Sequence, residues 1–205
     1  MVSDKKVKLL EVWRHNLFSE FSISEVIKLS KKRTKTWVFN TLKMFVKYNI
    51  ISSKRKGNLD LYSLDLKNPV SIGLLNYLEA QNNIGFSALE IISDIIDSIP
   101  VKEYSLIVFG SYAENKQIKN SDLDICLLIS NKETEKKLRP YFNEIKLNYS
   151  IKIDEHYITF SEFIQMLLRK EENLGKQIFK KHRLFYNSDM YYQLIKEAYK
   201  NGFRP

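Results

Sequence analysis

The sequence predicts a mixed α/β (α+β) protein. A small helical domain with a β-hairpin precedes a domain built on a mixed β-sheet with flanking helices. Three observations predict it. Apolar residues recur at helical spacing through residues 5–48, and two alternating strands follow at 50–55 and 59–64. After residue 100 the pattern changes to strand, turn, strand, helix and strand. The composition fits folded domains, because 44% of the 205 residues are hydrophobic and 13% are aromatic.

Composition and polar breaks divide the chain into three parts. Residues 1–66 form the predicted helical domain, and two apolar-periodic helices within residues 67–100 link it to the rest. The second linker helix begins with a capping-box pattern at Ser87 and Glu90. Residues 101–205 form the predicted second domain, with helices on one side of a mixed sheet. Its aromatic tail has helical spacing, which favours packing on the core over lining a base pocket or a partner surface.

Basic residues are concentrated in the first third of the chain. Residues 1–66 hold 14 Lys and Arg against 6 Asp and Glu, a balance of +8, whereas the whole chain carries +9. This concentration favours nucleic acid as the partner of the first domain. A role in dimerisation or protein docking is the alternative for this domain.

The composition also argues against membrane and disulfide-rich classes. No run of about 18 apolar residues is present, and the first residues lack the apolar core of a signal peptide. The single cysteine, Cys126, builds neither a disulfide framework nor a zinc site and is predicted to lie in the core. We therefore expect a cytoplasmic protein with no membrane partner.

The third helix of the first domain has one polar face. It is predicted over residues 34–48, and Asn49, which tolerates the left-handed conformation, ends it. A capping box at Ser22 and Glu25 opens the preceding, second helix. Three helices and a hairpin are the order of a winged helix-turn-helix domain, and residues 5–66 resemble the winged-helix domains of archaeal and bacterial regulators. The resemblance implies that the third helix enters the major groove of DNA. It assigns base contacts to Thr36, Asn40 and Lys43, phosphate contacts to Lys31, Lys32, Arg33 and Lys35, and the wing tip to Lys54, Arg55 and Lys56.

A strand, a Gly-Ser turn and a second strand carry the most informative motif of the chain. Residues 104–109 read as a buried strand that runs into Gly110 and Ser111, and ten residues separate this pair from Asp122. A glycine at such a junction lets the backbone approach a phosphate closely, and Ser111 offers an N–H and a hydroxyl at a helix start. The second strand is predicted over residues 123–129, with the acids at its start. Asp122 and Asp124 project from one face of it, where their carboxylates suit a pair of Mg²⁺ ions beside a triphosphate.

A third acid lies in the next predicted strand, at residues 150–158. Side-chain alternation places Asp154 on its polar face, whereas Glu155 points the other way. Asp154 would there complete the metal site or take the proton from an attacking hydroxyl, and a merely solvated strand residue is the alternative. His156 reads as a surface neighbour, since metal-assisted phosphoryl transfer does not require histidine.

A known family shares this motif. Residues 107–129 contain Gly-Ser, ten residues and Asp-x-Asp, and in this signature the chain resembles the polymerase-beta-type nucleotidyltransferase superfamily, in particular its small archaeal and bacterial minimal members. The resemblance covers roughly residues 85–160. It implies that Gly110 and Ser111 bind the nucleotide phosphates, that Asp122 and Asp124 bind Mg²⁺, and that Asp154 is the third acidic residue.

The first functional hypothesis is an enzyme that uses Mg²⁺, with two ions expected, to transfer a nucleoside monophosphate from an NTP to a hydroxyl. ATP is the expected NTP, and the acceptor is a protein or a nucleic acid. Many minimal members of the family are antitoxins that modify a tyrosine of a HEPN-type toxin. Such a toxin would be a separate chain here, because this sequence lacks the toxin signature. The winged helix departs from the pattern of the minimal family members, which have no such domain.

Two other hypotheses use the basic domain differently. In the first, the chain is a DNA-binding transcriptional regulator whose transferase fold senses nucleotide or is inactive. In the second, the winged helix presents RNA or DNA to the transferase site, and the enzyme modifies nucleic-acid ends. The sequence leaves the oligomeric state open, with a homodimer as one option.

Overall fold

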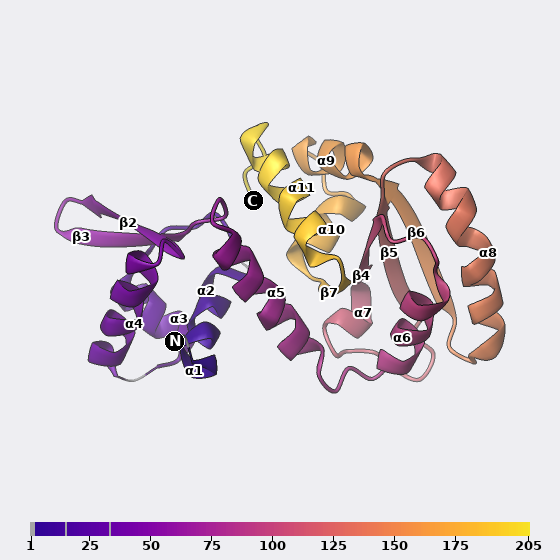
Figure 1. Cartoon of the computed structure of the whole chain (residues 1–205), viewed down its shortest axis with the longest axis horizontal. Helices are drawn as coiled ribbons and strands as arrows, with labels where there is room; N and C mark the ends of the chain where they lie inside the picture. The colour runs from indigo at the N-terminus through magenta and orange to yellow at the C-terminus, as the bar shows by residue number, and fades with distance from the viewer. Residues whose placement is uncertain (1–2, 15, 33) are drawn as a thin grey trace. The chain divides into compact units, whose positions relative to one another are not determined.

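The chain forms two compact units in the computed structural model, Met1–Leu78 and Glu79–Pro205, and each is described by itself (Figure 1). The structure describes residues 3–14, 16–32 and 34–205. Arg33, for which a phosphate contact is predicted, lies outside the described residues. The boundary between the two units falls inside helix α5 (Pro69–Asn83).

The first unit joins short helices to a three-stranded antiparallel sheet. Its elements in chain order are α1 (Asp4–Val7), the 3₁₀ helix η1 (Lys8–Leu10), α2 (Glu11–Arg14), β1 (Phe21–Ser22), α3 (Ile23–Ser30), α4 (Lys35–Lys47), β2 (Ile51–Lys56) and β3 (Leu59–Leu64). The predicted capping box is confirmed, because the Ser22 hydroxyl accepts from the Glu25 N–H and the Glu25 carboxylate accepts from the Ser22 N–H. Asn49 has the predicted left-handed conformation after α4, with φ of 54°.

The β2–β3 hairpin is the longest strand pair of the first unit. Strand β3 lies between β1 and β2, and Lys56 pairs with Leu59, so that the turn contains two residues. Gly57 adopts φ of 58° in this turn, a conformation that glycine reaches without steric cost. In Figure 1 the hairpin extends away from the helices of its own unit.

The second unit is built on a four-stranded mixed sheet. Its elements after α5 are α6 (Leu89–Ser98), β4 (Tyr104–Val108), α7 (Gly110–Ala113), β5 (Leu123–Ile129), α8 (Lys132–Asn148), β6 (Ile153–Thr159), α9 (Phe160–Leu168), α10 (Leu174–Lys180), β7 (Arg183–Tyr186) and α11 (Ser188–Lys200). The strand order is β6-β5-β4-β7, in which β5 and β6 run parallel and the other neighbours antiparallel. The predicted α/β class, with a mixed sheet and flanking helices, is confirmed.

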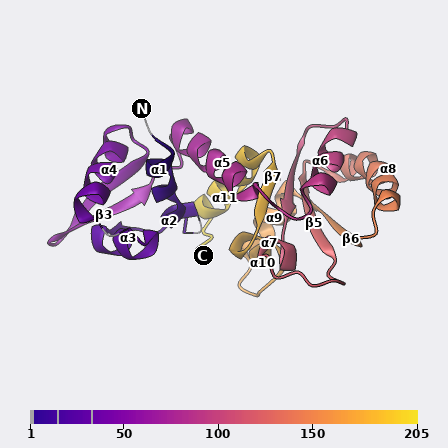
Figure 2. The same ribbon diagram turned by 90° about the horizontal axis from the view of Figure 1, so that it is seen from below.

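Helices cover both faces of this sheet, which corrects the expectation of helices on one side (Figures 1 and 2). Along β5, Ile125 and Leu127 join the core that α6 and α8 also line. Cys126 and Leu128 point to the opposite face and are also fully buried, where α9 packs on β5 and α11 packs on β4. A strand that is apolar on both faces must be packed against other elements on both faces. The near-continuous apolar run of β5 therefore indicated, in the sequence itself, that helices lie on both sides of the sheet.

The start of α6 differs from its prediction. The expected capping box at Ser87 is wrong, because α6 begins at Leu89 with Ala88 as its N-cap and without a side-chain cap. The Ser87 hydroxyl instead accepts a hydrogen bond of 3.0 Å from the Gln117 side chain. Helix α6 belongs to the second unit, where its buried face lines the core of the sheet.

Strand β7 was not predicted, because four residues are too few for a periodic pattern. It pairs with β4, and Arg183 at its start donates hydrogen bonds to the carbonyls of Asn82 and Ala113 and to the Asn115 side chain. These bonds fasten the segment after α7 to the edge of the sheet. Aromatic residues of the following α11, Tyr191 and Tyr192, are buried, as expected for packing on the core. None of the helices formed by the described residues has both the length and the apolar character needed to cross a membrane.

Candidate active site

Gly110 sits where β4 passes into α7, at a position that has no room for a side chain. Its φ is 66°, and a Cβ atom there would lie 2.0 Å from Asp124 Oδ2. The neighbouring Phe109 N–H donates a hydrogen bond of 3.1 Å to the Asp124 carbonyl. The backbone therefore holds the glycine against the Asp124 carboxylate, and the Gly-Ser turn and the acid belong to one local structure.

The three predicted acids are brought to one end of the β5–β6 pair. Asp122 immediately precedes β5, and Asp124 pairs in register with Asp154 on the parallel strand β6. Two of the three acids have a basic side chain beside them. Lys152 forms an ion pair with Asp122, and His156 Nε2 lies 3.3 Å from Asp154 Oδ2. His156 is thus a neighbour of the acids on the same strand face, as the alternation along β6 requires.

Glu155 points to the other face of the sheet, in agreement with the expected alternation. Its carboxylate is almost buried, with 9% of the side chain exposed, and pairs with Lys146 of α8. Asp154 is by contrast 51% exposed. Of the two adjacent acids in β6, Asp154 is therefore the one that shares the face of Asp124.

Negative charge accumulates around Asp124. Burial raises the pKa of the Asp124 carboxyl above its ordinary value, and the charges of Asp154 and Asp122 raise it further, against the lowering effects of His156 and Lys152. A carboxylate in this setting gains from a nearby cation. The donor set fits a divalent metal ion such as Mg²⁺, because hard carboxylate oxygens are its preferred protein ligands.

The side chains are not gathered into a finished metal cage. Within the part of the chain that the structure describes, no group of three or more His, Cys, Asp or Glu side chains is placed to hold a metal ion. Lys152 is 74% exposed and Asp122 is 36% exposed, so that this pair can separate without opening the core. Metal binding would therefore require the carboxylates to turn from their present partners.

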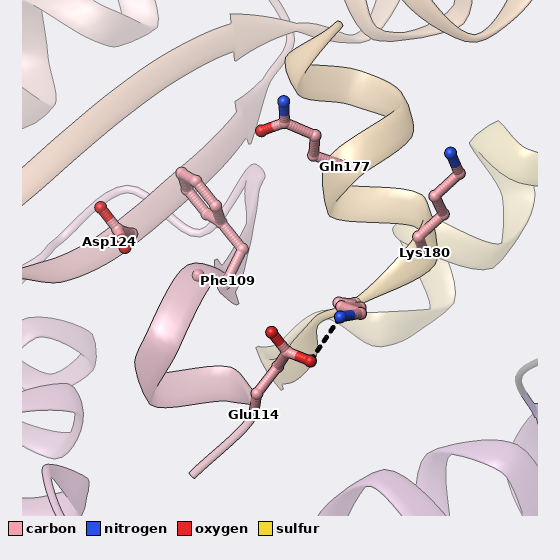
Figure 3. Close-up of a pocket in the computed structure, with 7 residues that line it drawn as sticks. Phe109, Glu114, Asp124, Gln177 and Lys180 are labelled. Carbon is pink, nitrogen blue, oxygen red and sulfur yellow. Dashed lines mark ion pairs between the residues drawn. The ribbon is translucent and has the colours of Figure 1, made fainter. Parts of the chain in front are cut away.

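A pocket of about 450 Å³ opens beside Gly110 and Asp124 (Figure 3). Phe109 and Glu114 line it on the side of α7, and three further residues line it from α10 and its end, namely Gln177, Lys180 and Lys181. Hydrogen bonding to Lys181 holds the pKa of the Glu114 carboxyl below its ordinary value. None of the three residues from α10 and its end was predicted from the sequence, since their only signal is a polar face on a seven-residue helix.

The helix that begins at the Gly110–Ser111 turn is very short. Helix α7 contains four residues, so the dipole of its single turn is smaller than that of a full helix. Ser111 is half-buried, and its carbonyl accepts a 2.9 Å hydrogen bond from the Lys116 N–H. Any contribution of Ser111 to phosphate binding would therefore come from its own N–H and hydroxyl.

The predicted DNA contacts lie on the surface of the first unit. Exposed side chains are present at Lys31, Lys35, Thr36, Asn40, Lys43, Lys54, Arg55 and Lys56, and Lys32 is half-exposed. Phe39, which was not predicted, is 37% exposed on α4, and Lys43 Nζ lies 4.7 Å from the centre of its ring. The polar face of α4 therefore carries a partly exposed aromatic ring beside a lysine.

Comparisons with known proteins bear on the second unit. No curated protein matches the chain. Among solved structures, human N-acetylserotonin methyltransferase in complex with SAM is similar over 48% of this chain and 31% of its own, with 10% identity and a TM-score of 0.28. A likeness this weak does not bear on fold or function. The family model described as a nucleotidyltransferase domain matches residues 89–186, a stretch that includes all three acids.

Proposed function

We propose that the second unit binds an NTP in the pocket beside Gly110 and transfers its nucleoside monophosphate to a hydroxyl group. The observation that carries the proposal is the meeting of Gly110 with Asp124 at the mouth of a pocket, next to Asp122 and Asp154. ATP is the expected substrate. The acceptor is a hydroxyl of a protein or a nucleic acid, and a HEPN-type toxin in a separate chain is one such protein.

Each residue has a distinct task in this reaction. Gly110 lets the Asp124 carboxylate lie against the turn. The backbone of the Gly110–Ser111 turn and the Ser111 hydroxyl then contact the phosphates. Asp122, Asp124 and Asp154 would hold Mg²⁺, which supplies charge neutralisation and polarises the phosphoryl group when bound. The acceptor oxygen attacks the α-phosphorus, the bond to the bridging oxygen breaks, and pyrophosphate leaves. Asp154 is exposed enough to take the proton that the acceptor hydroxyl loses.

A labelling experiment tests this proposal. The protein is incubated with each α-labelled NTP, Mg²⁺ and cell extract, beside an Asp122→Asn variant and an Asp97→Asn control, which removes an exposed carboxylate on α6. We expect label on a protein or a nucleic acid, reduced about 10²- to 10³-fold by Asp122→Asn and unchanged by Asp97→Asn. No Asp122-dependent label in any fraction would overturn the enzyme and favour a regulator that only senses nucleotide.

A DNA-binding role of the first unit is supported by a separate observation. Residues 1–66 of this unit carry a balance of +8, accompanied by an exposed polar face on α4 and by exposed basic residues along the β2–β3 hairpin. The α4 face would read bases in the major groove of DNA, and the hairpin would contact phosphates as a wing. This role serves either a transcriptional regulator or an enzyme that acts on nucleic-acid ends.

The salt dependence of duplex binding tests the DNA-binding role. Replacing Lys54, Arg55 and Lys56 together with alanine is expected to lower the slope of log K against log salt by about 3, because each phosphate contact contributes about 0.9. The matched control Lys137→Ala, an exposed lysine on α8, should leave the slope unchanged. If the wild-type protein shows no salt-sensitive binding to any duplex, the first unit serves dimerisation or protein docking instead.

A further inference from the structure

The wall of the pocket opposite Asp124 carries basic side chains. Lys180 is the last residue of α10, Lys181 follows as its C-cap, and Gln177 lies one turn earlier on the same helix. Figure 3 shows Gln177 and Lys180 across the pocket from Phe109 and Asp124. The two walls therefore have opposite charge, which is the arrangement that a metal-bound polyphosphate requires.

The position of α10 is fixed by close packing, so its polar face has a defined direction. Ile178 is fully buried, and Gly175 lies so near α9 that a Cβ atom there would meet the Met166 Cβ at 2.7 Å. Residues three apart share a helix face, which places Gln177 and Lys180 together on the pocket side. The Asn173 side chain accepts from the Lys176 N–H and caps the start of the helix.

Both lysines are held by carboxylates that a stronger anion can replace. Lys181 Nζ lies 2.5 Å from Glu114 Oε1, and the two side chains are 59% and 28% exposed. Lys180 Nζ lies 2.7 Å from Glu172 Oε1, with both side chains more than half exposed. Exposed ion pairs of this kind contribute little to stability, whereas a phosphate offers several charged acceptors at once.

We propose that Lys180 and Lys181 bind the β- and γ-phosphates of the incoming NTP, and that Glu114 holds Lys181 until the triphosphate takes its place. This inference rests on the proposed function, which puts the α-phosphate beside Asp124. The distal phosphates then extend toward α10, where two ammonium groups neutralise them. The same lysines would hold pyrophosphate after transfer, and an NMP, which lacks the distal phosphates, would bind without their help.

Binding measurements separate this role from a structural one. ATP and AMP are titrated calorimetrically in Mg²⁺ against the full chain, the Lys180→Ala/Lys181→Ala variant and the control Lys176→Ala, a lysine of the same helix that bonds to the Lys170 carbonyl instead of lining the pocket. The double variant should lose about 10- to 100-fold in ATP affinity and about twofold or less in AMP affinity. Lys176→Ala should leave the ratio of the two affinities unchanged.

A Glu114→Gln variant gives the opposite result if the carboxylate competes with phosphate. It should bind ATP about three- to tenfold more tightly, with little change for AMP, because Lys181 is released and a negative charge leaves the pocket. A structural role for these residues would alter the unfolding temperature and leave the ratio of ATP to AMP affinity as it was.

The outcomes distinguish this inference from the function on which it rests. If the wild-type protein binds ATP and the double variant keeps the wild-type ratio of ATP to AMP affinity, the inference is wrong and the proposed function stands. Weaker ATP binding by Glu114→Gln would overturn the part assigned to Glu114. If the wild-type protein binds none of the four NTPs, both the inference and the proposed function fail.

Discussion

Replacing Gly110 with alanine is expected to abolish most nucleotide transfer while leaving the protein folded. The added Cβ would lie 2.0 Å from Asp124 Oδ2, and the strand backbone cannot yield because Phe109 N–H is bonded to the Asp124 carbonyl. The clash is relieved when the Asp124 side chain rotates away, which removes a proposed metal ligand. We expect activity to fall about 10²- to 10³-fold, and the left-handed backbone to cost about 1 to 2 kcal/mol of stability.

Gly85→Ala is the matched control for the Gly110 prediction. Gly85 lies in the same unit with φ of 75°, yet a Cβ atom there meets nothing within 4 Å. The control should share the loss of stability and keep full transfer activity. Activity is measured with α-labelled NTP and stability by thermal unfolding. If the activities of the two variants agree within about threefold, transfer does not depend on the close approach of Gly110 and Asp124.

Asp124→Asn is expected to remove activity and to stabilise the metal-free protein. The pKa of the Asp124 carboxyl is raised in the fold, by burial first and then by the charge of Asp154. A carboxyl whose folded pKa exceeds its unfolded value contributes stability below the unfolded pKa and loses it as the pH rises through the folded pKa. At neutral pH the ionised Asp124 therefore destabilises the fold, and an uncharged amide of the same shape relieves this.

The stability change should be small and should depend on pH and on metal. Asp124 is only half-buried, so solvent screening limits the gain at pH 7 to about 1–3 °C in Tm. The gain should shrink as the pH falls through the pKa of Asp124, where the wild-type carboxyl becomes protonated. Mg²⁺ should raise the Tm of the wild-type protein and not that of the variant, because a ligand stabilises only a fold that binds it.

Calorimetric unfolding with and without Mg²⁺ checks both signs, with Asp97→Asn as the control for loss of an exposed carboxylate. If the metal-free Asp124→Asn protein unfolds at a lower temperature than the wild type, the negative charge of Asp124 does not destabilise the fold. Transfer activity in the same preparations should fall about 10²- to 10³-fold for Asp124→Asn alone.

Much of the local structure followed from spacing in the sequence. Strand β5 was predicted with its observed bounds, because a run of apolar residues bounded by polar ones is a strong signal. The capping box at Ser22 and the left-handed Asn49 were also predicted, since each depends on bonds or angles within a few residues. The proposed roles of Gly110, Ser111 and the three acids stay predictions, although their placement around one end of β5 is now described.

Errors arose where neighbours distant in sequence decide the outcome. Ser87 and Glu90 have the spacing of a capping box, yet the Ser87 hydroxyl accepts a hydrogen bond from the Gln117 side chain, and α6 starts without a side-chain cap. Strand β7 was missed because pairing with β4, rather than its own four residues, makes it a strand. The second helical layer on the sheet was missed for the same reason, since the apolar face of a helix does not say which surface it covers.

The residues of the motif alone indicated the chemistry: a glycine and two carboxylates at this spacing predict a phosphate beside a cation. Only the folded chain brings Asp154 into register with Asp124 and places Lys180 and Lys181 on the opposite wall of the pocket. The physical reason is range. Turn, cap and strand preferences act over a few residues and can be read along the chain, whereas a pocket forms between segments about 60 residues apart, which only packing around a shared core brings together.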